Sequence, residues 1–222
     1  MPGQQPEEAG AAPRPVLRPV VRAVGEDALL VTAGSAERVA ALYAELLARR
    51  DELPAVVEIV PAACTVLLDG VADRTALARA LAGWELPDLP PADGPSVTVP
   101  TVYDGADLAE IAALWGVSPE AAVRIHTGAE YRVAFCGFAP GFGYLTGLPE
   151  RYHVPRRATP RSAVPAGSVA LAGPYTGVYP RSSPGGWQLL GHTALRLWDT
   201  GREPAALLAP GTRVRFEAVA GG

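Results

Sequence analysis

Hydrophobic and polar positions in the N-terminal part of the chain follow two different periods, which predict both strands and helices. A short apolar run predicts a strand at residues 28–32, and paired strands are expected at 56–60 and 65–68. Apolar residues three and four positions apart predict one helix after Ser35 and another after Asp73, because both residue types cap helix N-termini. The expected order is strand, helix, two strands, helix.

A further apolar strand at residues 97–102 would complete a split β-α-β arrangement of the ferredoxin-like kind, with the Pro-rich stretch 87–95 as a stiff connection. The same strand could instead begin the next domain. We therefore expect a disordered tail at residues 1–15, rich in Pro, Gly, Gln and Ala, and a small ferredoxin-like α/β domain at 16–95.

Two short helices are predicted next, the first starting at Asp104 or Asp107 and ending at Gly116, the second capped by Ser118 and running to about His126. This is the outline of a helix-turn-helix. A DNA-reading helix needs polar and basic side chains toward the groove, and the second helix is mainly apolar. We therefore expect no DNA binding.

After Tyr131 the pattern consists of short apolar segments separated by Pro and Gly turns, and no helical period of useful length follows before residues 213–216. This pattern is typical of an all-β barrel or sandwich. The fold class is α+β, with a second domain at residues 96–222.

Composition narrows the function classes. The 222 residues are 49% hydrophobic and carry a net charge of -4, so nothing favours a nucleic acid or an anionic membrane as partner. The N-terminus has neither a basic start nor an apolar stretch, and no run approaches the roughly 20 apolar residues that span a bilayer. Cys64 and Cys136 show no redox or metal spacing, so we expect buried free thiols in a cytoplasmic protein.

Segment 138–145 and the run 156–192 set Pro and Gly beside aromatic residues and Arg. Proline restricts φ and glycine permits positive φ, so this region predicts specified turns around a groove with a rigid floor. The candidate substrate-binding or partner-binding residues are Pro140, Gly141, Phe142, Tyr144, Arg156, Arg161, Tyr179, Gly185, Gly186, Trp187 and His192.

Arginines in this region are candidates for binding anions. A guanidinium matches a carboxylate or phosphate in a bidentate fork, and Arg156, Arg157 and Arg161 are close together among prolines. Arg156 or Arg161 could therefore contact substrate, although a solvated basic loop explains them too. The glycine turns at Gly141 and 185–186 could present backbone N–H groups to an anion.

Aromatic residues of the region are candidates either for the barrel core or for ligand contact. We expect Phe142 and Tyr144 to be displayed, because both lie beside the Pro140-Gly141 turn. His192 could act as a general acid or base, or could simply form a hydrogen bond at the end of a strand.

Other titratable residues have simpler interpretations. Asp104 and Asp107 are expected to be helix caps, and His126 to place partial positive charge at a helix C-terminus. No pair of histidines has metal-ligand spacing, and the sequence contains neither a G-x-x-x-x-G-K-[ST] phosphate loop nor a convincing nucleophile triad. No metal is predicted, and catalytic residues stay unassigned.

Five blocks together resemble the B subunit of the bacterial ATP-dependent 5-oxoprolinase, a family also described as KipI-like histidine-kinase inhibitors and as allophanate hydrolase subunit 1. The blocks are residues 137–142 with Tyr144-Leu145, 155–161, 164–169, 176–180 and 184–191. The resemblance extends to the two helices before Tyr131 and to residues 210–216, and weakly through the N-terminal domain.

The resemblance implies a cyclophilin-like β-barrel in the second domain and a hydrolase complex with subunits A and C, in which ATP drives opening of 5-oxoproline to glutamate. Because the sequence lacks a phosphate loop, ATP is then expected on another subunit, and the chain is expected to be inactive alone. An alternative from the same resemblance is a regulator that binds a sensor histidine kinase through the barrel, and a further one is a prolyl isomerase.

The chain departs from the family pattern at four positions. Gly143 stands where Pro is expected, Tyr175 where Gln is expected, and His192 and Ala194 where Arg and Pro are expected. These differences affect expectations about substrate specificity and leave the turn framework intact.

Overall fold

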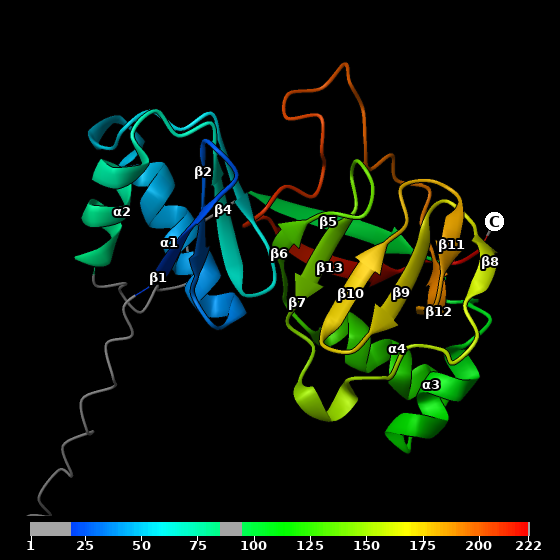
Figure 1. The fold of residues 1–222 in the computed structure, drawn as a ribbon. Coiled ribbons are helices and arrows are strands. Elements are labelled where there is room, and N and C mark those ends of the chain that lie inside the picture. Colours follow the sequence, from blue (N-terminus) through cyan, green and yellow to red (C-terminus); the bar gives the residue numbers. More distant parts are fainter. Residues whose placement is uncertain (1–18, 85–94, 222) are drawn as a thin grey trace, which may run out of the picture.

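The structure, a computed structural model, describes residues 19–84 and 95–221 and contains an N-terminal sheet with two helices and a larger C-terminal sheet (Figure 1). The N-terminal elements are β1 (Val20–Val24), β2 (Ala28–Thr32), α1 (Ala36–Ala48), the 3-10 turn η1 (Arg50–Glu52), β3 (Glu58–Pro61), β4 (Thr65–Asp69) and α2 (Arg74–Ala82). The C-terminal strands are β5 (Ser96–Thr101), β6 (Tyr131–Cys136), β7 (Gly143–Thr146), β8 (Arg161–Val164), β9 (Ser168–Ala172), β10 (Tyr175–Val178), β11 (Ser183–Gly185), β12 (Gln188–His192) and β13 (Arg213–Ala218). The C-terminal helices are α3 (Leu108–Trp115), α4 (Pro119–Gly128) and the 3-10 turn η2 (Glu150–Tyr152).

Local signals account for the N-terminal helices. The Ser35 hydroxyl accepts a hydrogen bond from the Arg38 N–H, and the Asp73 carboxylate accepts one from the Ala76 N–H, so both predicted caps are confirmed. Both helices pack their apolar faces on the sheet. The core consists mainly of Leu29, Val31, Val39, Leu42, Leu46, Val66, Leu68, Leu77 and Leu81.

The N-terminal sheet differs from the expected ferredoxin-like arrangement in its edge strand. Its order is β1-β2-β4-β3, and all pairs are antiparallel. Strand β2 therefore lies between β1 and β4, and the strand predicted at residues 97–102 is not part of this sheet. That strand is β5, which pairs in parallel with β13 in the other sheet. Strand β1 lacks a clear alternating pattern because four of its five residues are exposed.

The C-terminal sheet has seven strands in the order β12-β9-β10-β7-β6-β13-β5. Its two edge strands meet, because Val102, just after β5, exchanges two 2.9 Å backbone hydrogen bonds with His192 at the end of β12. The sheet is therefore nearly closed, consistent with the expected cyclophilin-like barrel. Val133, Leu145, Leu171, Leu190 and Phe216 are among the apolar residues that fill its interior.

Helices α3 and α4 pack against β12 and β13 and cover one end of the barrel (Figure 1). Gly116 ends α3 in the left-handed conformation at φ 68°, and Ser118 caps α4, as the sequence predicted. Within the described residues, none of the helices has the length and apolar character needed to span a membrane.

Both cysteines are free thiols, but the expectation that both are buried is wrong for Cys64, which is exposed beside the turn between β3 and β4. Cys136 is partly buried, and burial raises the pKa of its thiol to about 11. A protonated thiol reacts slowly, so Cys136 behaves as a small apolar residue.

His126 is fully buried, in contact with the rings of Tyr103, Tyr131 and Phe216, and its Nδ1 shares a 2.7 Å hydrogen bond with the Tyr103 hydroxyl. Burial lowers its pKa to about 3, so the imidazole is neutral. The expected positive charge at the end of α4 is therefore absent.

His126 makes stability depend on pH in a defined direction. The folded-state pKa lies below the ordinary value near 6.5, so stability is complete above that value and declines as the pH falls toward 3, where the unfolded chain alone binds the proton. At pH 5 this group reduces the free energy of unfolding by about 2 kcal/mol.

Urea denaturation at pH 7 and pH 5 tests this for the wild type, His126→Gln and the control His153→Gln, whose residue is only partly buried. His126→Gln should lose about 2 kcal/mol of the difference between the two pH values, because Gln does not titrate. An unchanged difference in that variant would contradict the assignment.

Candidate functional site

The turn at residues 137–142 displays an aromatic side chain through an uncommon backbone conformation. Phe138 has φ 65°, and no other non-glycine residue in the described ranges has a positive φ. Its side chain is 60% exposed and lies edge-on to the rings of Phe142 and Tyr179, with centroids 5.4 and 6.3 Å away. A positive φ costs about 1–3 kcal/mol for a non-glycine residue, so the fold maintains this exposed ring at a cost.

Most of the predicted aromatic site residues are core residues. Phe142, Tyr179 and Trp187 are buried, and the Phe142 ring meets the other two edge-on at 5.4 Å. The expectation that Phe142 is displayed is therefore wrong. The sequence signal that was overlooked is Gly177: a Cβ there would lie 3.0 Å from both Phe142 and Trp187, so its absence makes room for the two rings.

Tyr144 is half-buried at the margin of this cluster and stacks on Phe135 with a centroid distance of 4.4 Å. Burial raises the pKa of the Tyr144 hydroxyl, and the positive charge of Arg156 opposes the rise. Arg156 acts in the same sense on Tyr179, and its own side chain is exposed. Four side chains therefore reach the surface beside the aromatic cluster, those of Phe138, Pro140, Tyr144 and Arg156.

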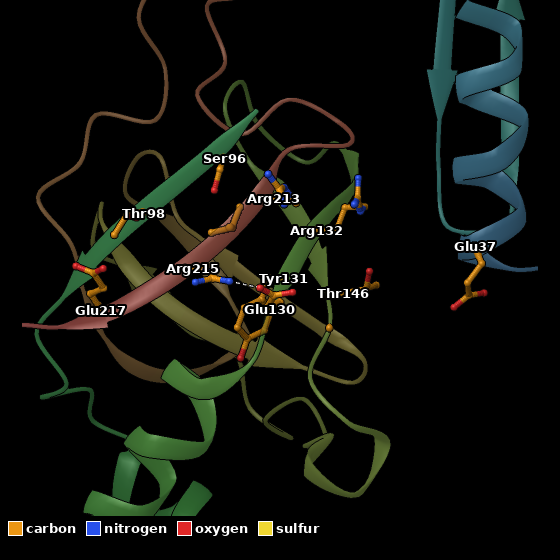
Figure 2. Close-up of a pocket in the computed structure, with 12 residues that line it drawn as sticks. Glu37, Ser96, Thr98, Glu130, Tyr131, Arg132, Thr146, Arg213, Arg215 and Glu217 are labelled. Atoms are coloured by element: carbon orange, nitrogen blue, oxygen red, sulfur yellow. Dashed lines mark hydrogen bonds and ion pairs between the residues drawn. The ribbon is translucent and has the colours of Figure 1, made fainter. Parts of the chain in front are cut away.

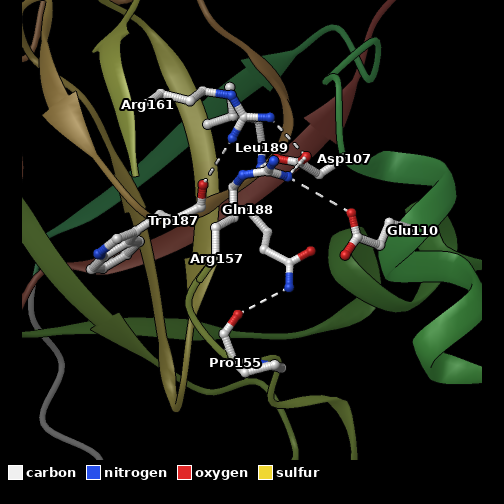
Figure 3. Close-up of polar contacts among 8 residues, drawn as sticks. All are labelled: Asp107, Glu110, Pro155, Arg157, Arg161, Trp187, Gln188 and Leu189. Carbon is white, nitrogen blue, oxygen red and sulfur yellow. Dashed lines mark hydrogen bonds and ion pairs between the residues drawn. The ribbon is translucent and has the colours of Figure 1, made fainter. Parts of the chain in front are cut away.

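Asp107 forms a second centre, an ion cluster between α3, β8 and β12 (Figure 3). Its Oδ1 accepts hydrogen bonds from Arg157 Nη1 at 2.7 Å and Arg161 Nη2 at 2.8 Å, and its Oδ2 accepts one from the Leu189 N–H at 2.7 Å. Desolvation raises the pKa of this carboxyl, but the hydrogen bonds from Arg161 and Leu189 and the two arginine charges outweigh it and lower the pKa overall.

This geometry corrects the expectation that Asp107 caps a helix. Asp107 does occupy the N-cap position of α3, but its carboxylate caps no helical N–H and turns instead to the arginines and β12. Sequence reasoning missed this role because Leu189 and Arg161 are more than fifty residues away along the chain.

The 155–161 segment is held against the Gly185-Gly186 turn, since the Arg157 N–H donates to the Gly186 carbonyl at 2.8 Å. Arg161 begins β8, opposite Gly185 of β11. Gly185 lies against the Tyr179 hydroxyl, where a Cβ would approach within 2.2 Å. Gly185 therefore serves close packing, whereas a Cβ at Gly186 would meet nothing closer than 3.6 Å, and anion binding by the N–H groups of both glycines stays a prediction.

His192 lies at the end of β12, and its Nδ1 shares a 2.8 Å hydrogen bond with Oδ1 of Asp104, both side chains being exposed. A hydrogen bond at a strand end is what the simpler interpretation predicted. The carboxylate orients the imidazole, and a role as general acid or base stays a prediction.

A separate open groove of about 710 Å³ lies on the outer face of β5, β13 and β6, away from both centres (Figure 2). It is polar, with Ser96, Thr98, Arg213 and the Arg215–Glu130 ion pair in its lining. None of the predicted site residues lines it, and no group of three or more potential metal ligands occurs among the described residues.

The molecule combines a nearly closed, barrel-like sheet, consistent with a cyclophilin-like fold, with a face that carries aromatic and arginine side chains. Residues 19–208 match the family of the carboxyltransferase domain, subdomain C and D. The B subunit of 5-oxoprolinase from Escherichia coli O157:H7 is 43% identical over 206 residues, which cover 87% of this chain and 93% of that protein. The chain belongs to the family of 5-oxoprolinase B subunits.

Solved structures share the fold. The crystal structure of TTHA0988 is 37% identical with a TM-score of 0.73, and the match covers 91% of this chain but only 41% of that longer one. The Kluyveromyces lactis urea amidolyase is 19% identical with a TM-score of 0.71 over 91% of this chain and 15% of that protein, a likeness of fold alone.

Gly177→Ala tests the packing of the aromatic cluster. The added methyl group must displace the Phe142 or Trp187 ring, which should lower the free energy of unfolding by about 1–3 kcal/mol. Gly128→Ala is the matched control, because nothing lies within 4 Å of its Cβ position. Equal denaturation midpoints for the two variants would show that the rings are not tightly packed at Gly177.

Proposed function

We propose that this chain is the B subunit of a cytoplasmic, ATP-dependent 5-oxoprolinase that acts with subunits A and C and opens 5-oxoproline to glutamate. The observation that carries the proposal is membership of the family of 5-oxoprolinase B subunits. The alignment with the Escherichia coli relative spans nearly the whole of that protein, so the proposal concerns the whole subunit.

The chemistry of the proposed reaction calls for several distinct sites. An unstrained lactam is a poor electrophile, and ATP supplies the activation by phosphorylating the amide oxygen before water attacks the ring carbon. The products are glutamate, ADP and phosphate. Such a reaction needs a nucleotide site, a site for the lactam and groups that stabilise negative charge.

This chain fits part of that requirement. All 19 of its basic residues are arginines, so it lacks the lysine of a phosphate loop, which supports placing ATP on another subunit. What the chain does offer is guanidinium groups beside aromatic surface, which suit the carboxylate of 5-oxoproline and a partner's apolar side chains.

The exposed Phe138 supports an interface with another subunit. A large apolar ring held at the surface by a positive φ is costly for an isolated protein, and buried aromatic anchors dominate many protein interfaces. We place Phe138 and the neighbouring Tyr144 in the contact with the C subunit.

Reconstitution tests the function. Purified subunits A and C with ATP and 5-oxoproline should form glutamate only when this chain is added, and the chain alone should form none, because we expect another subunit to bind the nucleotide. Glutamate is measured by an enzyme-coupled assay. Glutamate formation that does not depend on this chain would refute the proposal.

Phe138→Ala tests the interface. If Phe138 is an anchor, the concentration of the chain that gives half-maximal glutamate formation should rise about tenfold or more, while the rate at saturation changes little. Leu114→Ala on α3 is the control, since Leu114 is similarly exposed at 54% but lies on the helices at the barrel end. Equal titration curves for the two variants would remove Phe138 from the interface.

A further inference from the structure

Two guanidinium groups converge on one carboxylate oxygen at the Asp107 cluster. Arg157 and Arg161 both donate to Oδ1 of Asp107, whose side chain is only 3% exposed. Two positive charges and one negative charge leave the trio with a net positive charge. Glu110 approaches Arg157 only to 3.8 Å and is 61% exposed, so solvent screens most of its effect.

Both arginines retain donors that Asp107 does not use. A guanidinium has five N–H groups, and the side chains of Arg157 and Arg161 are still 32% and 23% exposed. The first turn of α3 begins at the same place, and its N–H groups add partial positive charge there. The surface over the cluster is therefore electropositive and can donate several hydrogen bonds.

A second observation shows that polar capacity is left unfilled. Gln188 is 2% exposed, and its Nε2 donates to the Pro155 carbonyl at 2.9 Å, but its Oε1 has no partner among the described residues. Arg157 Nε is likewise buried without a partner there. Figure 3 shows the Gln188 amide below the two guanidinium groups, toward Pro155.

Unpaired buried polar atoms are uncommon in folded proteins, because each costs the free energy of its lost hydration. The Arg157–Gln188 cluster therefore holds polar capacity that the protein's own groups leave unfilled. The exposed arginine donors and the net positive charge of the trio indicate an anionic molecule.

We propose that Arg157 and Arg161 form an oxyanion site for the carboxylate or phosphate group of a small ligand, with Asp107 as the residue that positions both. This assignment deepens the proposed function, on which it rests for the choice of ligands: the carboxylate of 5-oxoproline and the phosphate released from ATP share the required chemistry. The sequence pointed to Arg156 or Arg161 as the substrate contact and to Arg157 only as their neighbour, and Asp107 was expected to be a cap.

Asp107 contributes by holding two like charges close together. Without its carboxylate, the guanidinium groups would repel each other and lose the fixed orientation that a bidentate contact requires. The Leu189 N–H donates a hydrogen bond to the other carboxylate oxygen. The backbone of β12 therefore fixes the carboxylate, and the carboxylate fixes both guanidinium groups. A preorganised pair binds an anion with less loss of side-chain entropy.

Binding by the full-length chain tests the site directly. Inorganic phosphate, 5-oxoproline and the uncharged 5-oxoprolinamide are titrated while the arginine Nε–H signals are followed by NMR, and the Arg157 signal is assigned from Arg157→Ala. We expect an anion to shift the Arg157 signal and the uncharged amide not to shift it. Phosphate binding without 5-oxoproline binding would identify the phosphate as the source, and the reverse the carboxylate.

Substitutions give the expected magnitude. Arg157→Ala and Arg161→Ala should each weaken anion binding about tenfold to hundredfold, the size of a lost charge-assisted pair of hydrogen bonds. Arg124→Ala, on the exposed face of α4, is the matched control and should bind as the wild type does. No anion binding by the wild type, or equal affinity in all three variants, would overturn the proposal.

The role of Asp107 is tested in the reconstituted complex. Asp107→Asn should raise the KM of the anion's parent substrate about tenfold or more with a smaller change in kcat, and Asp107→Glu should restore part of the loss. A merely structural role would lower thermal stability and leave the KM of the folded fraction unchanged, which would refute positioning. If Asp107→Asn fails to fold, Asp107→Glu and the arginine variants decide.

The proposed reaction and the proposed oxyanion site can be refuted independently of each other. Anion binding by the isolated chain, combined with no glutamate from the complex, would remove the proposed reaction and leave the oxyanion site. Glutamate formation with unaltered kinetics in Arg157→Ala and Arg161→Ala would leave the reaction and remove the site.

Discussion

The close contact between segment 102–107 and strand β12 is the constraint on which both the barrel and the candidate site depend. Backbone hydrogen bonds join Val102 to His192, Gly105 to Leu190 and Asp107 to Leu189. A Cβ at Gly105 or Gly191 would lie within 2.3 Å of the opposing backbone, so only glycine permits this approach. The contact joins the two edge strands of the seven-stranded sheet at the end of β5.

The same contact determines where charge is buried. The Asp107 N–H donates to the Leu189 carbonyl, and its carboxylate accepts from the Leu189 N–H, which takes that carboxylate out of water. A buried carboxylate is unfavourable unless donors surround it, and the two arginines of the 155–161 segment supply them. The contact that closes the barrel therefore also brings the two guanidinium groups together. A substitution in segment 102–107 or in the facing part of β12 would disturb both.

Sequence reasoning succeeded where the cause is local. The caps at Ser35, Asp73 and Ser118 and the end of α3 at Gly116 depend on residues within one helical turn, and each could be read from the pattern. The strand at β5 was predicted, but its partner was left open. A period of two identifies a buried face and does not say which of two sheets the strand joins.

The sequence predicted which segments form the candidate site more reliably than it predicted what each residue does there. The turn-rich segments do contain the aromatic cluster and the arginines. Whether Phe142 is exposed, however, depends on the space beside Gly177. The direction of the Asp107 carboxylate depends on its hydrogen bonds with Leu189 and Arg161. Both are properties of packing between distant segments. Phe138 is the clearest example of what the sequence does not predict. Its positive φ occurs at a turn position where residue preferences alone would favour glycine.

The charged chemistry of the candidate site comes from arginine. Arginine, which is always charged and binds oxyanions through a planar fork, is the sole basic residue besides three histidines, and two of its side chains are positioned by one carboxylate. Such an arrangement suits holding an anion in a fixed orientation, and it lacks a nucleophile activated by a neighbouring base. On the proposed function, this chain orients substrate while a partner subunit binds ATP.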